Sequence, residues 1–187
     1  MRPTYMTTRL IEDPRAVRQY DLGGHTHYRL DYHFVWRVRF NRKVLGQVLS
    51  PILVDLIDSI CLNKGVKLLG LAVAADHVHL CARLRPAHAP SQVMRWIKTN
   101  TSKELFERFP HLESRFGSRR FWGRGYHVET LGDRPVFAIL AYIGKQDDHH
   151  DLRALEAHFA EVDEFLTTAA MQPDDGPRPG AEGDEWD

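Results

Sequence analysis

The sequence contains little cysteine and no long apolar run. Its 187 residues include only two cysteines, Cys61 and Cys81, so there is no disulfide framework and we expect a reducing, cytoplasmic environment. Because eighteen consecutive apolar residues never occur, we expect no transmembrane helix. Residues 1–19 lack the apolar core of a secretory signal. The length suits one domain with additional segments.

The chain also has no net charge, but its charges are segregated. Residues 28–146 contain 19 Lys and Arg against 9 Asp and Glu, whereas residues 147–187 contain 2 against 13. A basic region of this kind suits a phosphate backbone, and an ordinary solvated surface explains the excess equally well. The acidic end is either a solubilising segment or one that folds back on the basic region.

Residue patterns predict the helices and strands. Aromatic and β-branched residues predict a strand over 26–40, with His33 on the face opposite Phe34. Apolar residues three and four apart predict a helix over 45–62 that ends at Asn63-Lys64-Gly65. Strands are predicted over 66–75 and 77–84, with a hairpin at Ala75-Asp76. A helix over 91–109, a loop over 110–119 and a strand over 121–131 follow. Two further helices are predicted over 134–146 and 152–166.

The order β-α-β-β-α-β-α plus a C-terminal helix predicts an α+β fold. We expect a ferredoxin-like or RRM-like four-stranded antiparallel sheet with helices on one face. The chain divides into an N-terminal extension (1–25), a main domain (26–147), a C-terminal amphipathic helix (148–170) and an acidic tail (171–187). The tail is rich in Pro, Gly, Asp and Glu, a composition typical of disorder.

Two histidines lie two positions apart in one predicted strand. Since side chains alternate along a strand, His77 and His79 face one side of the sheet, and Val78 and Leu80 point into the core. Two imidazoles on a rigid strand could chelate a divalent ion. Alone, such a pair is more often a set of ordinary polar residues on an open sheet face.

Tyr142 and Gln146 lie four positions apart on the predicted helix 134–146 and therefore share one stripe. They flank the apolar face that contains Ile139 and Ile143. Tyr142 is either a half-buried aromatic residue or one that reaches a site beside the core.

Together these four residues predict a phosphoryl-transfer site. Two imidazole nitrogens and an amide oxygen would leave a metal ion with open positions for a phosphate, which the metal would polarise. A tyrosine hydroxyl could then attack and keep one DNA end as a phosphotyrosine, which conserves the bond energy for rejoining.

Five segments, in this order, resemble the single-tyrosine HUH transposases, the TnpA type of insertion sequences that transpose as single-stranded DNA. The segments are Tyr32-His33-Phe34-Val35-Trp36, Asn41-Arg42-Lys43-Val44-Leu45, Asp76-His77-Val78-His79-Leu80, Phe121-Trp122-Gly123-Arg124-Gly125-Tyr126-His127-Val128 and Ala141-Tyr142-Ile143-Gly144-Lys145-Gln146. The resemblance covers about residues 26–146.

The resemblance implies that His77, His79 and Gln146 bind magnesium or manganese and that Tyr142 is the nucleophile, forming a 5′-phosphotyrosine. It also implies single-stranded DNA with hairpins at the element ends as substrate, and a homodimer in which the tyrosine helix of one subunit can complete the site of the other. A sister group that binds repeated extragenic palindromes shares the histidines and the tyrosine. Its tyrosine is commonly followed by Asn-Pro, so Gln146 favours the insertion-sequence type.

Basic and aromatic residues are candidates for DNA contacts, with ordinary solvated positions as the alternative for each basic residue. The basic candidates are Arg42, Lys43, Arg95, Lys98, Lys103, Arg119, Arg120 and Arg124. Trp96 and Trp122 could stack on bases. Core packing is the alternative for both tryptophans, and it is favoured more for Trp96.

Other histidine and cysteine groups carry weaker hypotheses. Cys81 shares the face of His77 and His79, so a His-x-His-x-Cys zinc site could form, although a small buried cysteine is the commoner explanation. His25-Thr26-His27 and His149-His150 are predicted to be exposed.

Two further functions fit the same predicted fold. A non-catalytic single-stranded nucleic-acid-binding module would use a similar sheet, but the strands lack the aromatic RNP pattern. A metal-dependent phosphodiesterase that uses water would cut without a covalent link. The acidic C-terminal region suggests, in addition, self-inhibition by mimicry of DNA.

Overall fold

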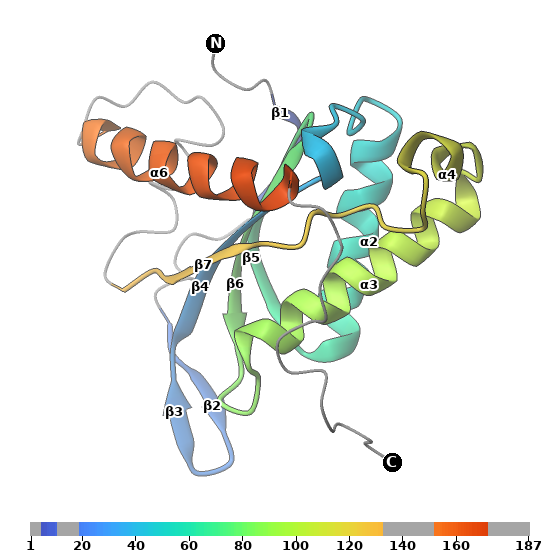
Figure 1. The fold of residues 1–187 in the computed structure, drawn as a ribbon. Helices are drawn as coiled ribbons and strands as arrows, with labels where there is room; N and C mark the ends of the chain where they lie inside the picture. The colour runs from blue at the N-terminus through green and yellow to red at the C-terminus, as the bar shows by residue number, and fades with distance from the viewer. Residues whose placement is uncertain (1–4, 11–18, 133–151, 172–187) are drawn as a thin grey trace, which may run out of the picture.

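The computed structural model describes residues 5–10, 19–132 and 152–171. Its main feature is an antiparallel sheet in the order β1-β5-β6-β4-β7 (Figure 1). The strands are β1 (Tyr5–Leu10), β4 (Leu30–Arg37), β5 (Lys67–Ala74), β6 (His77–Leu84) and β7 (His127–Thr130). The predicted α+β fold with a four-stranded antiparallel sheet is confirmed by β5-β6-β4-β7. β1, which comes from the predicted N-terminal extension, pairs with β5 as a fifth strand.

One face of the sheet carries the larger core. Phe34 and Trp36 of β4 and Val78 and Leu80 of β6 are fully buried in it. The helices α2 (Leu49–Lys64) and α3 (Pro90–Arg108) cover this face (Figure 1). The prediction that Val78 and Leu80 point into the core is confirmed, and strand alternation directs the histidines of β6 to the opposite face.

The opposite face is covered in part by α6 (Leu152–Met171), the predicted C-terminal helix. Val162 and Leu166 of α6 are buried with Val35 of β4 in a second, smaller apolar cluster. The one-sided arrangement expected for the helices therefore describes α2 and α3, whereas α6 lies on the histidine side of the sheet (Figure 1). Among the described residues, no helix has both the length and the apolar character needed to cross a bilayer.

Helix α2 begins four residues later than the sequence predicts. Leu45 is fully buried, but it lies before the helix, where its N–H donates to the carbonyl of Ala75 at 2.9 Å. Val48, which also fits the apolar spacing, is 69% exposed. Gly65 ends the helix as predicted, with a left-handed φ of 65° that glycine adopts at little cost.

The segment between α3 and β7 differs from its prediction. The sequence predicts a loop over 110–119, but α4 (His111–Phe116) forms there, because Leu112 and Phe116, four positions apart, bury the same face. The sequence also predicts a strand over 121–131, of which only β7 is a strand. Trp122 adds a single bridge to Val38.

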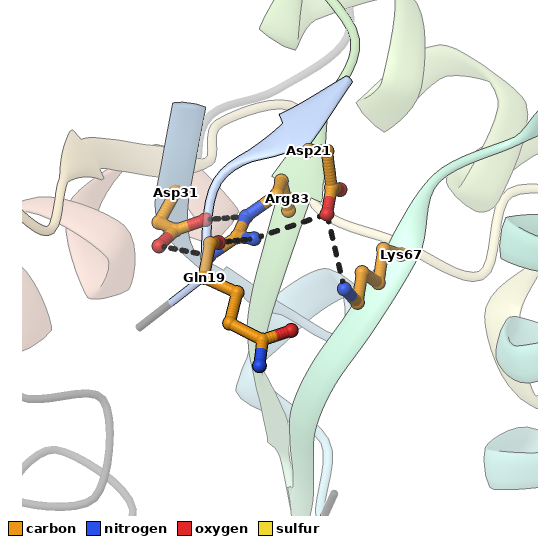
Figure 2. Close-up of polar contacts among 5 residues, drawn as sticks. All are labelled: Gln19, Asp21, Asp31, Lys67 and Arg83. Carbon is orange, nitrogen blue, oxygen red and sulfur yellow. Dashed lines mark hydrogen bonds and ion pairs between the residues drawn. The ribbon is translucent and has the colours of Figure 1, made fainter. Parts of the chain in front are cut away.

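A small hairpin of β2 (Asp21–Gly23) and β3 (Thr26–Tyr28) projects beyond the main sheet (Figure 1). Arg83, which is 1% exposed, ties its start to the sheet. The Arg83 guanidinium donates to the carboxylate of Asp31 through Nε at 2.6 Å and Nη2 at 3.0 Å. Its Nη1 donates to the carbonyl of Gln19 and to the carboxylate of Asp21 (Figure 2).

Candidate active site

The histidines of β6 lie side by side on the sheet face opposite the larger core. The ring centroids of His77 and His79 are 5.1 Å apart, with the ring planes at 72°. Both residues are buried, at 6% and 5% exposure. The period of two along β6 therefore brings together the pair of imidazoles that the sequence predicts.

Asp76 holds the first of these imidazoles. Its carboxylate oxygen Oδ1 lies 2.7 Å from Nδ1 of His77, and its Oδ2 accepts a hydrogen bond from Nη1 of Arg37 at 3.0 Å. Burial acts to raise the pKa of Asp76, but the hydrogen bonds and charges of His77 and Arg37 outweigh it and hold this pKa below its usual value. Asp76 is therefore a carboxylate, which can accept a hydrogen bond from Nδ1–H of His77.

The second imidazole meets a third histidine, from the neighbouring strand. Nε2 of His33 lies 3.1 Å from Nδ1 of His79, and the two rings are stacked at 9° with centroids 5.3 Å apart. Nδ1 of His33 lies 3.3 Å from Oε1 of Glu129 on β7. Burial, with smaller contributions from the charges of His77 and His33, lowers the pKa of His79 well below 6.5, so His79 is neutral at pH 7.

The sequence pattern puts His33 on the open face of its strand but does not pair it with His79. That pairing depends on the register of β4 against β6, in which Val35 is opposite His79. His33 is then the diagonal neighbour of His79 across the two strands. The contact of Glu129 with His33 depends on a separate pairing, that of β4 with β7, in which Glu129 is opposite His33.

The described residues fit part of a metal site. Each imidazole of the pair has its Nδ1 against a polar partner, so Nε2 is the nitrogen that would coordinate a divalent ion. Within residues 5–10, 19–132 and 152–171, no group of three or more His, Cys, Asp or Glu side chains is arranged to hold a metal. Gln146, the predicted third ligand, and Tyr142, the predicted nucleophile, lie outside the described residues.

The zinc alternative at Cys81 is weakened by its surroundings. Cys81 is fully buried, and burial raises the pKa of its thiol well above the usual value. A zinc ligand must be a thiolate, so this environment opposes coordination. His25 and His27 are exposed on the β2–β3 hairpin, as predicted, and His149 and His150 lie outside the described residues.

A basic cleft of about 960 Å³ lies between α3 and the segment 119–126. It brings together most of the basic residues that the sequence puts forward for DNA contacts. They are Arg95, Lys98, Lys103, Arg119, Arg120 and Arg124, joined by Arg39, Ser91, Thr99, Ser102, Tyr126 and the acidic Glu107. Arg42 and Lys43 are exposed but are not among the residues that line the cleft.

Lys98, one of the predicted contact residues, is held by hydrogen bonds within the fold. The Lys98 ammonium donates to the carbonyls of Gly123 at 2.6 Å and of Arg124 and Gly125 at 3.2 Å. Burial lowers the pKa of Lys98 to about 8, which leaves it mostly protonated at pH 7. Lys98 therefore fastens the 123–125 segment to α3.

Trp122 packs in the core, where little of its ring is available to a base. It is 6% exposed, its indole N–H donates to the hydroxyl of Thr101 at 2.9 Å, and its ring meets Trp36 edge to face. Trp96 is only partly buried, with the ammonium of Lys64 5.2 Å from its ring centroid. The prediction that Trp96 is the more core-like of the two tryptophans is wrong.

Comparison with known proteins gives consistent matches. A model of the IS200-like transposase family matches residues 26–146. The transposase for insertion sequence element IS200 of Salmonella typhimurium is 30% identical over 109 residues, which cover 58% of this chain and 72% of that protein. The ISDra2 transposase TnpA of Deinococcus radiodurans is 26% identical over 121 residues, which cover 65% and 86% of the two chains.

A solved structure supports the same grouping. The crystal structure of a Deinococcus radiodurans R1 transposase superimposes with a TM-score of 0.57 at 27% identity and covers 69% of this chain and 99% of that chain. The family match includes strands β4, β5, β6 and β7, the histidine pair and the basic cleft, and it extends over more than half of the sequence. The chain therefore belongs to the IS200-like transposases, a family of DNA-binding enzymes that cleave DNA during transposition.

Proposed function

We propose that this transposase cleaves and rejoins single-stranded DNA at the ends of an insertion sequence through a 5′-phosphotyrosine intermediate. The observation that carries the proposal is the pair of buried imidazoles on β6, each with Nδ1 against a polar partner. This arrangement suits two ligands that approach one ion through Nε2.

His77 and His79, with Gln146, would hold Mg²⁺ or Mn²⁺. The bound ion would polarise the phosphate at the cut site and stabilise its developing charge. Tyr142 would supply the nucleophile: its hydroxyl loses a proton, its oxygen bonds to phosphorus, and the bond from phosphorus to the 3′-oxygen breaks. The 3′-oxygen takes up a proton and leaves as a hydroxyl group, while the 5′-phosphate stays on the tyrosine.

The basic cleft would bind phosphates of the DNA substrate. Four of its residues, Arg95, Arg119, Arg120 and Arg124, are exposed. A guanidinium group can bind a phosphate through two hydrogen bonds. Hairpins at the element ends are the proposed substrate, and a homodimer is the proposed assembly.

The test is an adduct assay with the full-length chain. A labelled single strand that contains a hairpin, incubated with MnCl₂, should give a protein-DNA adduct that survives denaturing electrophoresis. Tyr142→Phe should abolish this adduct and keep DNA binding, and chelation of the metal should prevent it. Tyr20→Phe is the matched control and should keep the adduct, because Tyr20 is an exposed tyrosine that does not line the basic cleft.

The other outcomes identify the alternatives. Binding without cleavage, with or without metal, would indicate a non-catalytic binding module. Cleavage without an adduct that is unaffected by Tyr142→Phe would indicate a phosphodiesterase that uses water.

A further inference from the structure

Glu129, His33 and His79 form a line of polar contacts across three strands of the sheet. Oε1 of Glu129 on β7 lies 3.3 Å from Nδ1 of His33 on β4, and Nε2 of His33 lies 3.1 Å from Nδ1 of His79 on β6. His33 is fully buried, and the side chain of Glu129 is 16% exposed. A buried imidazole with a partner at each nitrogen has a fixed ring orientation.

The protons along this line have one arrangement that satisfies each contact when both imidazoles are neutral, as metal binding requires. A carboxylate only accepts hydrogen bonds, so Glu129 requires the proton of His33 to be on Nδ1. Nε2 of His33 then has a lone pair and accepts from the Nδ1–H of His79. Because a neutral imidazole carries one N–H, the lone pair of His79 is on Nε2.

We propose that His33, held by Glu129, is a positioning residue that fixes the tautomer and ring orientation of His79 for metal coordination through Nε2. The inference rests on the proposed metal site at His77 and His79. A hydrogen-bond acceptor behind a ligand histidine, such as a carboxylate, sets which ring nitrogen coordinates the metal and raises the basicity of that nitrogen.

His77 provides a comparison within the same site. Its Nδ1 meets the Asp76 carboxylate directly, at 2.7 Å, from the adjacent position in the chain. The carboxylate behind His79 is reached through a second imidazole and depends on the pairing of β4 with both β6 and β7. Each of the two ligands would therefore coordinate through its own Nε2. The Asp76 carboxylate holds Nδ1 of His77, and the His33 imidazole holds Nδ1 of His79.

The expected effect concerns metal affinity. His33→Leu fills the space of the imidazole with an apolar side chain and removes both ring nitrogens. It should weaken Mn²⁺ binding about 10–100-fold. His33→Gln should restore most of the affinity, because its amide oxygen can accept the Nδ1–H of His79. His111→Leu is the matched control, since His111 is exposed on α4. The Mn²⁺ affinity of this variant should equal that of the unaltered protein.

The test uses the full-length protein with two readouts that are independent of cleavage. Titration calorimetry with MnCl₂ gives the affinity, and long-range ¹H–¹⁵N spectra of the metal-free protein give the tautomer of each imidazole. We expect Nδ1–H tautomers for His33 and His79, loss of the fixed tautomer of His79 in His33→Leu, and its recovery in His33→Gln.

Three results would overturn the inference, and they separate it from the proposed function. An Nε2–H tautomer of His79 in the unaltered protein contradicts it without any variant, so the test remains decisive even if His33→Leu does not fold. Equal Mn²⁺ affinity in a folded His33→Leu removes the positioning role but keeps the metal site. If the unaltered protein binds Mn²⁺ no better than the His77→Ala, His79→Ala double variant, the proposed site and this inference both fail.

Discussion

Asp31 and Arg83 form a buried ion pair with two hydrogen bonds, although they lie 52 positions apart in the chain. Their side chains are 8% and 1% exposed. Removal of the two charges from water costs free energy. The attraction between the opposite charges offsets this cost, so each can be buried only while the other is present. Arg83 also binds Gln19 and Asp21 (Figure 2), so the same pair anchors the β2–β3 hairpin to the sheet.

We expect Asp31→Ala to lower the free energy of unfolding by about 3–5 kcal/mol, because it leaves the Arg83 charge buried with less compensation. Urea denaturation monitored by circular dichroism measures this change. Glu104→Ala is the control: it removes an exposed ion pair with Arg108 on α3 and should cost less than about 1 kcal/mol. Equal effects of the two substitutions would contradict the proposed importance of the buried pair.

The basic cleft predicts a specific dependence of DNA binding on salt. Arg119 and Arg120 both line it, so the double alanine variant should weaken single-stranded DNA binding. The slope of log affinity against log salt is negative, and its magnitude should fall by about 0.7 for each phosphate that the variant no longer neutralises, or by about 1.4 for two. Fluorescence anisotropy over a salt series measures the slope.

The matched control for the cleft is Arg115→Ala, because Arg115 is exposed on the nearby α4 and does not line the cleft. Its slope should equal that of the unaltered protein. A double variant whose slope also stays unchanged would show that DNA binds elsewhere on the surface.

Protonation of His79 should oppose folding. Burial, and then the charges of His77 and His33, lowers the pKa of His79 in the folded protein well below the 6.5 of an unperturbed histidine. The unfolded chain therefore takes up this proton as the pH falls below about 6.5, before the folded chain does, and the equilibrium shifts toward unfolding.

We expect the free energy of unfolding of the metal-free protein to be smaller at about pH 5.5 than at about pH 7.5, with a smaller difference for His79→Gln. Urea denaturation at the two pH values measures both differences. An identical pH dependence in the variant would mean that other groups are responsible.

The acidic tail can be removed while the whole of helix α6 is kept. Residues 172–187 contain six acidic residues and one basic residue, whereas Val162 and Leu166 of α6 are buried against Val35. Truncation after Met171 removes the tail and keeps α6, whereas truncation after Gln146 would also uncover Val35. If the tail competes with DNA, the shorter chain should bind single-stranded DNA roughly severalfold more tightly at low salt, because removal of like charge reduces repulsion.

Anisotropy titrations of the two chains, at low and at high salt, measure that effect. A full-length variant with the six acidic residues changed to Asn and Gln should behave like the truncated chain. Unchanged or weaker binding after truncation would exclude self-inhibition by the tail.

The sequence alone determined the features that follow from local geometry. The period of two in β6 correctly predicted that His77 and His79 share a face while Val78 and Leu80 enter the core. Gly65 correctly predicted the end of α2, because few other residues adopt a left-handed backbone without strain. The roles of Tyr142 and Gln146, outside the described residues, stay predictions.

Tertiary structure decided the features that depend on strand register and on packing between distant segments. His33 meets His79 across 46 positions and Glu129 across 96, and no periodicity within one segment encodes those contacts. The assignment of Trp122 to the core likewise depends on Thr101 and Trp36. The sequence specified the chemical groups on each strand, and the alignment of strands β6, β4 and β7 specified which of them touch, since a hydrogen bond requires its two atoms within about 3 Å.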